Sequence, residues 1–215
     1  MSDIIKVNGT VLSASPIGEQ DKRVVLETCE LGRITVFARG CRRSGSPLQA
    51  AANPFVTGQF SVISGSSAYR MADASIIEYF REIAALQPGV YMGFYFLDLV
   101  DYYGREGIDG TDMLNLLFVS LKALLNEKLP DRLVRRIFEM KLLALNGEYF
   151  PEPDKMPERI YPVCRYITDS PAGKVYSFNV DEDILSGLEN VCDKALKRTI
   201  DKELKSKKIM EMFYK

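Results

Sequence analysis

The spacing of apolar residues changes once along the chain, close to residue 79. Before that point, short runs rich in Val, Ile, Thr, Phe and Tyr are separated by Gly, Pro, Asn and Ser, which is typical of β-strands joined by turns. This pattern predicts five strands, which cover residues 6–14, 22–28, 33–38, 59–64 and 69–78. After residue 79 the apolar positions recur about every 3.6 residues, as they do in helices. We therefore expect two domains, residues 1–79 and residues 80–215.

The first domain is expected to be a small closed barrel, because five short strands within about 80 residues suit that architecture. The gap between the third and fourth strands carries SPLQAAA, a candidate helical turn, at the place where an OB-fold has its extra helix. An SH3-like barrel and a half-sandwich are alternatives that the strand pattern leaves open. The fold class predicted for the chain is α+β, with an N-terminal OB-fold β-barrel followed by an all-α domain.

The second domain is expected to contain four longer helices. Their apolar positions fall on one face each, and they cover residues 90–103, 111–125, 130–145 and 181–199. A turn-rich insertion at about residues 148–180 separates the third helix from the fourth, and residues 174–179 within it are a candidate short strand. The basic tail, residues 202–215, is amphipathic, with Ile209, Met210 and Phe213 on one side.

Composition excludes most familiar enzyme designs. The chain has no histidine, so it lacks the commonest general base and the commonest transition-metal ligand. Asp98 and Asp101 lie one helical turn apart and are a candidate acid–base pair, but no other catalytic group accompanies them. Gly173 and Lys174 resemble the end of a phosphate loop, yet Val175 replaces the Ser or Thr that such a loop needs. We therefore expect no enzyme activity.

The first residues, MSDIIKVNGT, lack the basic flank and apolar core of a signal peptide. The most apolar run, residues 90–100, is too short to span a bilayer and contains Asp98. The four cysteines, at positions 29, 41, 164 and 192, include no closely spaced pair, so we expect reduced thiols rather than disulfides. These features predict a cytoplasmic protein that does not engage a membrane.

Charge is segregated along the chain, although its net value is only −1. The sharpest feature is ITVFARGCRRSGSPL, where a predicted strand leads Arg39, Arg42 and Arg43 into a loop of Gly and Ser. From residue 31 to residue 72 the chain has five arginines and no acidic residue. Guanidinium groups without nearby carboxylates suit the phosphates of a single-stranded nucleic acid. A merely solvated charged face is the alternative reading.

Base stacking would require exposed aromatic rings near these arginines. The predicted barrel offers four candidates, which are Phe37, Phe55, Phe60 and Tyr69. Aromatic residues on strands commonly pack in the core, so none of the four is assigned a contact with DNA from the sequence.

The run VLSASPIGEQDKRVVLETCELGRITVFARGCRRSGSPL resembles the start of RecO-family recombination mediators, most specifically in ARGCRRSGSPL. The later runs FYFLDLVDYY and DKELKSKKIM are also similar to RecO sequences. The resemblance implies an OB-fold and a helical domain, DNA binding by the basic barrel face, and annealing of strands without ATP. It further implies handoff of DNA coated by single-stranded-DNA-binding protein to RecA, with RecR as a partner.

Arg39, Arg42 and Arg43 match the basic loop of the family motif, and the charge map adds four further candidates for contact with single-stranded and double-stranded DNA: Lys22, Arg23, Arg33 and Arg70. The sequence departs from the family at PVCRYITDSPAGKVYSF, where many relatives carry a four-cysteine zinc module and this chain keeps only Cys164. We therefore expect no metal and no other cofactor.

The resemblance also implies that the helical domain captures the acidic, apolar C-terminal tail of single-stranded-DNA-binding protein. The candidate residues form a basic group on the third predicted helix, namely Arg132, Arg135 and Arg136. A different class of function stays open, in which the whole molecule is a protein-interaction adaptor whose OB-like barrel has little affinity for DNA. The net acidity favours the adaptor, and the acid-free arginine segment favours DNA binding.

Overall fold

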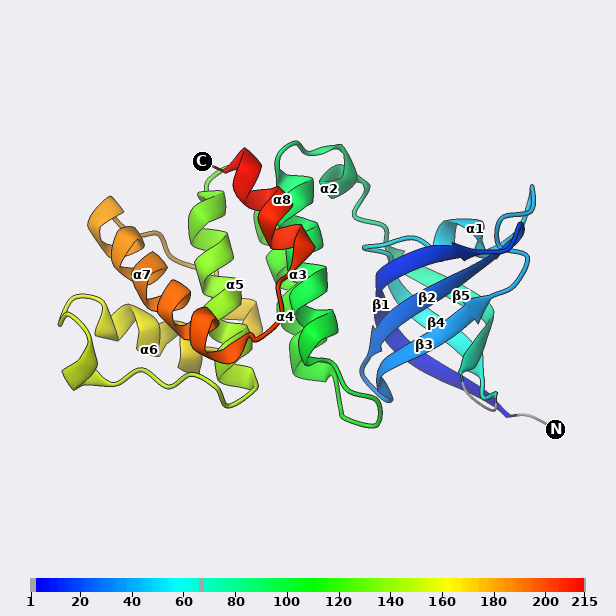
Figure 1. Ribbon diagram of the computed structural model, residues 1–215, viewed down its shortest axis with the longest axis horizontal. Helices are drawn as coiled ribbons and strands as arrows, with labels where there is room; N and C mark the ends of the chain where they lie inside the picture. Colours follow the sequence, from blue (N-terminus) through cyan, green and yellow to red (C-terminus); the bar gives the residue numbers. More distant parts are fainter. Residues whose placement is uncertain (1–2, 66–67, 215) are drawn as a thin grey trace. The chain divides into compact units, whose positions relative to one another are not determined.

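The computed structural model describes residues 3–65 and 68–214 (Figure 1). The chain divides into two compact units. The first contains Met1–Arg81 and Leu97–Leu114, and the second contains Glu82–Phe96 and Asn115–Lys215. The predicted boundary at residue 79 lies two residues before the end of Met1–Arg81. The sequence pattern did not indicate that residues 97–114 belong to the same unit as the strands.

Five strands form a closed barrel in the first unit (Figure 1). They are β1 (Ile4–Ile17), β2 (Asp21–Thr28), β3 (Gly32–Ala38), β4 (Thr57–Ile63) and β5 (Tyr69–Glu78). Their order around the barrel is β1-β2-β3-β5-β4, and every neighbouring pair is antiparallel except β3 and β5. The short helix α1 (Leu48–Ala51) connects β3 to β4. This is the arrangement of an OB-fold, so the predicted fold class is confirmed.

The barrel interior is built by alternation along the strands. In β3 the even-numbered residues, such as Ile34 and Val36, are fully buried, while the odd-numbered residues between them are only half-buried. β1 is long enough to pair with both β4 and β2, and its register shifts between Val11 and Ser13. The buried apolar side chains of this core include Val7, Val24, Leu26, Ile34, Val36, Phe60, Val62 and Met71. Each contributes roughly 1.5–3 kcal/mol through burial.

The second unit is helical. Across both units the described α-helices that follow the barrel are α2 (Arg81–Ala85), α3 (Gly89–Tyr103), α4 (Thr111–Leu124), α5 (Asp131–Leu145), α6 (Tyr161–Asp169), α7 (Glu182–Thr199) and α8 (Lys205–Phe213). The four helices predicted from periodicity agree with α3, α4, α5 and α7 within one residue at most ends. Asp181 caps α7, because its side chain accepts a hydrogen bond from the Ile184 backbone N–H at 2.9 Å. None of these helices is long and apolar enough to cross a membrane.

The turn-rich insertion differs from expectation. Residues 174–179 form no strand; instead, the 3₁₀ helices η1 (Pro153–Lys155) and η2 (Ala172–Lys174) flank α6. α6 has only nine residues and contains Pro162 near its start, so its period is too short to read from sequence. Its buried residues, Cys164 and Ile167, lie on one face, and α5 packs against both α6 and α7.

A buried carboxylate lies at the centre of the helical unit. Glu139 of α5 is fully buried and accepts hydrogen bonds from Tyr95 Oη at 2.8 Å, Arg135 Nε at 2.8 Å and Arg136 Nη1 at 2.7 Å. Burial by itself would raise the pKa of Glu139, but the two guanidinium groups outweigh it and the pKa is lowered. The side chain is therefore a compensated charge inside the core.

Replacing Glu139 with Ala is expected to reduce the free energy of unfolding by about 3–5 kcal/mol, because two largely buried arginines would lose their common partner. Urea denaturation measures this change. Glu211→Ala is the control, since Glu211 contacts Arg135 at 3.3 Å from the surface and should cost less than about 1 kcal/mol. Equal losses for both variants would contradict a central role for Glu139.

Candidate nucleic-acid interface

The predicted DNA-binding cations fall into two groups in the structure. Five are exposed on the barrel, namely Arg23, Arg39, Arg42, Arg43 and Arg70. The other two, Lys22 and Arg33, are half-buried and bonded to neighbouring groups. The structure thus brings five of the candidates to the barrel surface and leaves two half-buried.

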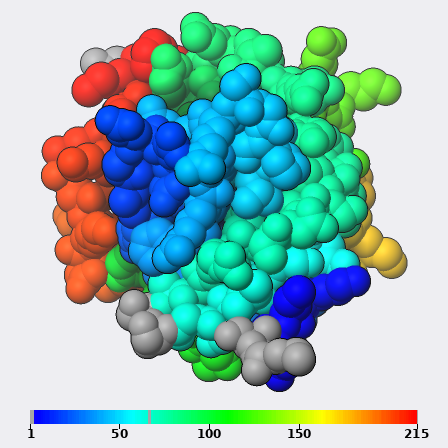
Figure 2. Space-filling model, turned by 90° about the vertical axis from the view of Figure 1, so that its right-hand side faces the viewer, coloured from blue at the N-terminus to red at the C-terminus, as the bar shows by residue number. Residues whose placement is uncertain are grey.

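Arg39, Arg42 and Arg43, which we call the arginine rim, lie in the loop between β3 and α1. The Arg42 backbone N–H donates to the Gln20 carbonyl at 2.9 Å, and its guanidinium donates to the Gly18 carbonyl at 3.2 Å. Arg43 Nε donates to Gln20 Oε1. The β1–β2 turn and the β3–α1 loop therefore lie side by side, as the blue and light-blue surfaces of the barrel show (Figure 2).

The arginine rim has no ion-paired carboxylate among the described residues. The nearest acidic group bonded to the loop is Asp21, whose carboxylate accepts from the Gly40 backbone N–H at 2.7 Å. The guanidinium groups consequently keep donors available for an external anion.

A second cationic feature lies across three neighbouring strands on the outside of the barrel. It consists of Arg23, Phe37 and Arg70, and we call it the outer row. The strand register pairs Arg23 of β2 with Phe37 of β3, and Phe37 with Arg70 of β5. Neighbouring positions on the same strands, Val36 and Met71, are buried in the core. Since successive side chains on a strand point to opposite faces, the outer row points away from the core.

Lys22 has a structural partner at the end of α1. Its Nζ donates to the Ala52 carbonyl and to Asn53 Oδ1, both at 2.8 Å. A cation at the C-terminal end of a helix satisfies free carbonyls there. A contact of Lys22 with DNA stays a prediction, because the ammonium group would have to leave these bonds.

Arg33 is paired with Asp101. Its Nε donates to Asp101 Oδ1 at 2.5 Å, and both side chains are about two-thirds buried. Asp101 is thus held in an ion pair with Arg33. Its carboxylate is therefore not free to form the candidate acid–base pair with Asp98. Arg33 points outward from β3 like Phe37 but lies four residues earlier, near the start of the strand.

An unusual carboxyl group neighbours this ion pair. Glu27 of β2 lies opposite Arg33 in the strand register and is fully buried, and neither of its carboxylate oxygens has a hydrogen-bond partner within residues 3–65 and 68–214. Gly104 and Gly110 pass so close that a Cβ on either would lie 2.4 Å from a Glu27 oxygen. Only glycine allows this approach.

Burial raises the pKa of Glu27 to about 8, although the Arg33 guanidinium acts in the opposite direction and Asp101 adds to the increase. Glu27 is therefore protonated in the folded protein at neutral pH. The uncharged Glu27 side chain packs between β2 and residues 104–110. Because it carries no charge, Arg33 pairs with Asp101 instead.

The cations predicted to bind a protein partner have carboxylate partners within the chain. Arg132 of α5 bonds to Glu182 and Glu189, each at 2.8 Å. The side chains of Arg135 and Arg136 are only 10% and 7% exposed and pair with Glu139. Their α5 positions lie in the core of the helical unit rather than on an open rim, and a role in partner binding stays a prediction.

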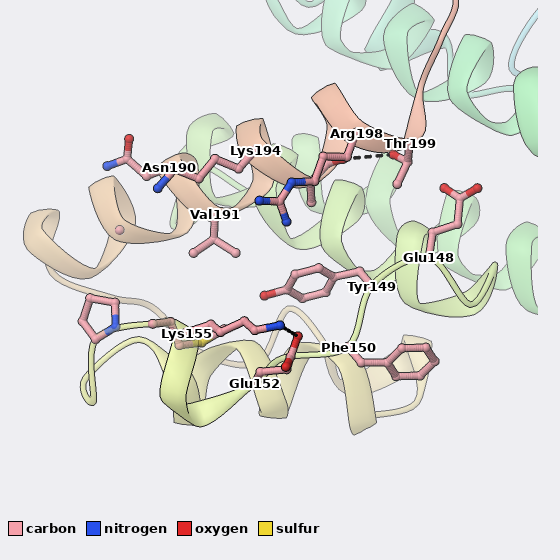
Figure 3. Close-up of a pocket in the computed structure, with 14 residues that line it drawn as sticks. Glu148, Tyr149, Phe150, Glu152, Lys155, Asn190, Val191, Lys194, Arg198 and Thr199 are labelled. Atoms are coloured by element: carbon pink, nitrogen blue, oxygen red, sulfur yellow. Dashed lines mark hydrogen bonds and ion pairs between the residues drawn. The ribbon is translucent and has the colours of Figure 1, made fainter.

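A different basic groove lies in the helical unit. A cavity of about 600 Å³ is lined by apolar residues, which are Tyr149, Phe150, Met156, Pro157, Val191 and Ala195, by the cations Lys155, Lys194 and Arg198, and by the carboxylates Glu148 and Glu152. The cations outnumber the carboxylates by one. Val191 and Arg198 of α7 face Tyr149 and Lys155 across the cavity (Figure 3). The sequence did not indicate this groove, because its two walls are about forty residues apart and one is irregular.

The cysteines are free thiols. Among the residues that the structure describes, no group of three or more Cys, Asp and Glu is placed to hold a metal ion. The expected absence of zinc stays a prediction.

Comparison with known proteins identifies the family. A family model described as "Recombination protein O N terminal" matches residues 1–80, the segment that forms the barrel. A DNA repair protein RecO from Caldicellulosiruptor saccharolyticus is 34% identical over 148 residues, which are 69% of this chain and 60% of the relative. The chain belongs to the RecO family.

Other RecO relatives agree. DNA repair proteins RecO from Alkaliphilus metalliredigens and Bacillus pumilus are 31% and 33% identical over 144 residues, which are 67% of this chain and 58% and 56% of the relatives. The chain spans about 60% of the length of the curated RecO proteins that it matches. The family model covers the barrel with its arginine rim, and the 148-residue match to the first relative extends beyond these 80 residues.

Glu27 gives a test of this RecO barrel. Between the ordinary pKa of 4.5 and the folded value of about 8, the folded state holds a proton that the unfolded state releases, so the free energy of unfolding falls as pH rises. Glu27→Gln cannot titrate, and its stability relative to the wild type should increase from pH 5 to pH 8. Urea midpoints at both pH values measure this difference.

The matched control is Glu30→Gln, which alters an exposed glutamate near the same strand. It should leave the pH dependence of the wild type unchanged over this range. Parallel stability profiles for the wild type and Glu27→Gln would show that Glu27 is ionised in the folded protein.

Proposed function

We propose that this RecO chain acts in DNA repair as a recombination mediator whose barrel binds single-stranded DNA and anneals complementary strands. The observation that carries the proposal is the arginine rim on an OB-fold, with no ion-paired carboxylate among its described neighbours. OB-folds bind oligonucleotides on the face of their second and third strands and through adjoining loops. The rim and the outer row occupy such a face.

The physical basis is phosphate neutralisation. Three exposed guanidinium groups can each donate two hydrogen bonds to phosphate oxygens. Bonds between the Arg42 backbone and Gln20 hold the loop against the β1–β2 turn, so less ordering accompanies binding. Such contacts position a strand without reading its bases, which suits a protein that anneals many sequences.

The wider role rests on family likeness. RecO relatives are described as DNA repair proteins, and we propose the same process here, including handoff of coated DNA to RecA together with RecR, without ATP. Double-stranded DNA would bind the same rim through its phosphates. A cytoplasmic, nucleoid-associated location belongs to this proposal.

A protein-interaction adaptor is the second candidate, and the basic groove of the helical unit favours it. Its apolar walls and its cations Lys155, Lys194 and Arg198 suit an acidic peptide with an apolar end. Lys155 is paired with Glu152 at 2.8 Å, which leaves the two α7 cations as the main attraction. We propose that this groove receives the C-terminal tail of single-stranded-DNA-binding protein, so both functions would coexist in one chain.

Replacing Arg39, Arg42 and Arg43 together with Ala is expected to weaken single-stranded DNA binding and annealing. Each lost phosphate contact should flatten the plot of log affinity against log salt by about 0.7, or roughly 2 for the triple variant. The three side chains are exposed, so the free energy of unfolding should change little. Fluorescence anisotropy with labelled oligonucleotides of several sequences, at a series of salt concentrations, measures the effect.

The charge-matched control removes three exposed lysines of the helical unit, Lys128, Lys202 and Lys205, and should keep most of the salt dependence. If both triple variants lose the same affinity and slope, general charge rather than the arginine rim governs binding. An unchanged slope in a folded rim variant would refute the proposed DNA site.

The groove proposal predicts that Lys194→Ala with Arg198→Ala weakens binding of a labelled tail peptide by about five- to thirtyfold, since each exposed charge contact contributes roughly 0.5–1 kcal/mol. Lys202→Ala with Lys205→Ala is the control and should bind the peptide like the wild type. Anisotropy titration of the full chain measures both. Loss of peptide affinity only in Arg132→Ala would instead support the site predicted from sequence.

A further inference from the structure

The four barrel aromatics have different environments. Phe55 and Phe60 are buried, and Tyr69 packs against the barrel core. Phe37 is half-buried on the outward side of β3 and lies outside that core cluster. Among the residues that the structure describes, no aromatic ring stacks on it. Phe37 is therefore the aromatic of the four whose ring faces away from the core.

Two cations flank this ring. Arg23 and Arg70 are the register neighbours of Phe37 on β2 and β5, and both are exposed. Neither takes part in an ion pair within the described part of the chain; Arg23 has only a long contact to Thr35 Oγ1, at 3.4 Å. Neighbouring strands lie about 4.8 Å apart, so the backbone positions of both arginines lie directly beside Phe37 on the outer face of the barrel.

Phe37 is half-buried, so part of its ring remains open to solvent, and the exposed arginines beside it leave donors available for an anion. The outer row therefore offers an apolar face and two cations on one surface. A nucleotide satisfies all three groups together, because its base offers a flat face and its backbone carries phosphates on both sides. Single-stranded DNA sites combine cationic grooves with stacking rings in this way.

We propose that Phe37 is a stacking platform for one base of single-stranded DNA, and that Arg23 and Arg70 hold the phosphates that flank this base. The inference deepens the proposed DNA binding and rests on it. A base inside a duplex is already stacked and its face is inaccessible. The outer row therefore favours single strands over duplexes, whereas the arginine rim attracts the phosphates of both.

The platform has a distinct signature in affinity. Losing the ring should weaken single-stranded DNA binding by about five- to 150-fold, the range for one stacked base. Because the ring carries no charge, the slope of log affinity against log salt should stay unchanged. Duplex affinity should also stay unchanged. Loss of Arg23 or Arg70 would behave differently, since each would flatten the slope.

The experiment uses Phe37→Leu, which keeps an apolar side chain on the strand, and Phe37→Trp, which keeps a ring. The chain contains no tryptophan, so the Phe37→Trp variant carries a single indole reporter at the platform. Oligo(dT) should quench its fluorescence with the same midpoint as anisotropy, and a duplex of equal length should not. Phe37→Leu should show the loss of affinity given above.

The control is Phe213→Leu, because Phe213 is a 52% exposed aromatic residue of the helical unit. This variant should bind oligo(dT) like the wild type. If the wild type fails to bind oligo(dT) at low salt, the proposed function itself is wrong. If the wild type binds but Phe37→Leu binds equally well, or the indole is not quenched, the platform is wrong and the arginine rim alone accounts for binding. Should Phe37→Leu unfold, quenching of Phe37→Trp still decides.

Discussion

The parallel pairing of β3 with β5 is the constraint on which the barrel depends. It consists of two register pairs, Val36 with Tyr69 and Phe37 with Arg70, whereas the antiparallel pairs are much longer. Without it the sheet would have two free edges and an open interior. The same pairing brings Arg70, which is distant in sequence, beside Phe37 and Arg23. The pairing of β3 with β5 thus both closes the barrel and places the three residues of the outer row next to one another.

Two buried glutamates illustrate how surroundings determine charge. Glu139 accepts three hydrogen bonds, two of them from arginines, and its pKa is lowered. Glu27 has no such donors among the described residues, and its pKa is raised. The first is an anion that organises the helical unit. The second is a neutral acid, and the missing Cβ atoms of Gly104 and Gly110 allow residues 104–110 to lie against it.

Much of the fold could be predicted because its signals are local. Alternation around Ile34 and Val36 indicated strands, and SPLQAAA indicated α1. The prediction failed where the signal was short or non-local: α6 was missed, and the expected strand at 174–179 is absent. The same division applies to the exposure of the candidate cations, whose role in DNA binding stays a prediction. Loop position indicated that Arg42 and Arg43 are exposed, but the partners of Arg33 and Lys22 lie on segments that only folding brings near.

The loop that carries the arginine rim is fixed largely by its main chain. The Arg42 N–H bonds to the Gln20 carbonyl, and the Gly40 N–H bonds to Asp21, so the loop path does not require arginine at positions 42 and 43. Side chains there can change without altering the scaffold that presents them. The loop is therefore a place where ligand preference can be redesigned independently of stability, by exchanging the chemical groups at 42 and 43 while the β1–β2 turn keeps their geometry.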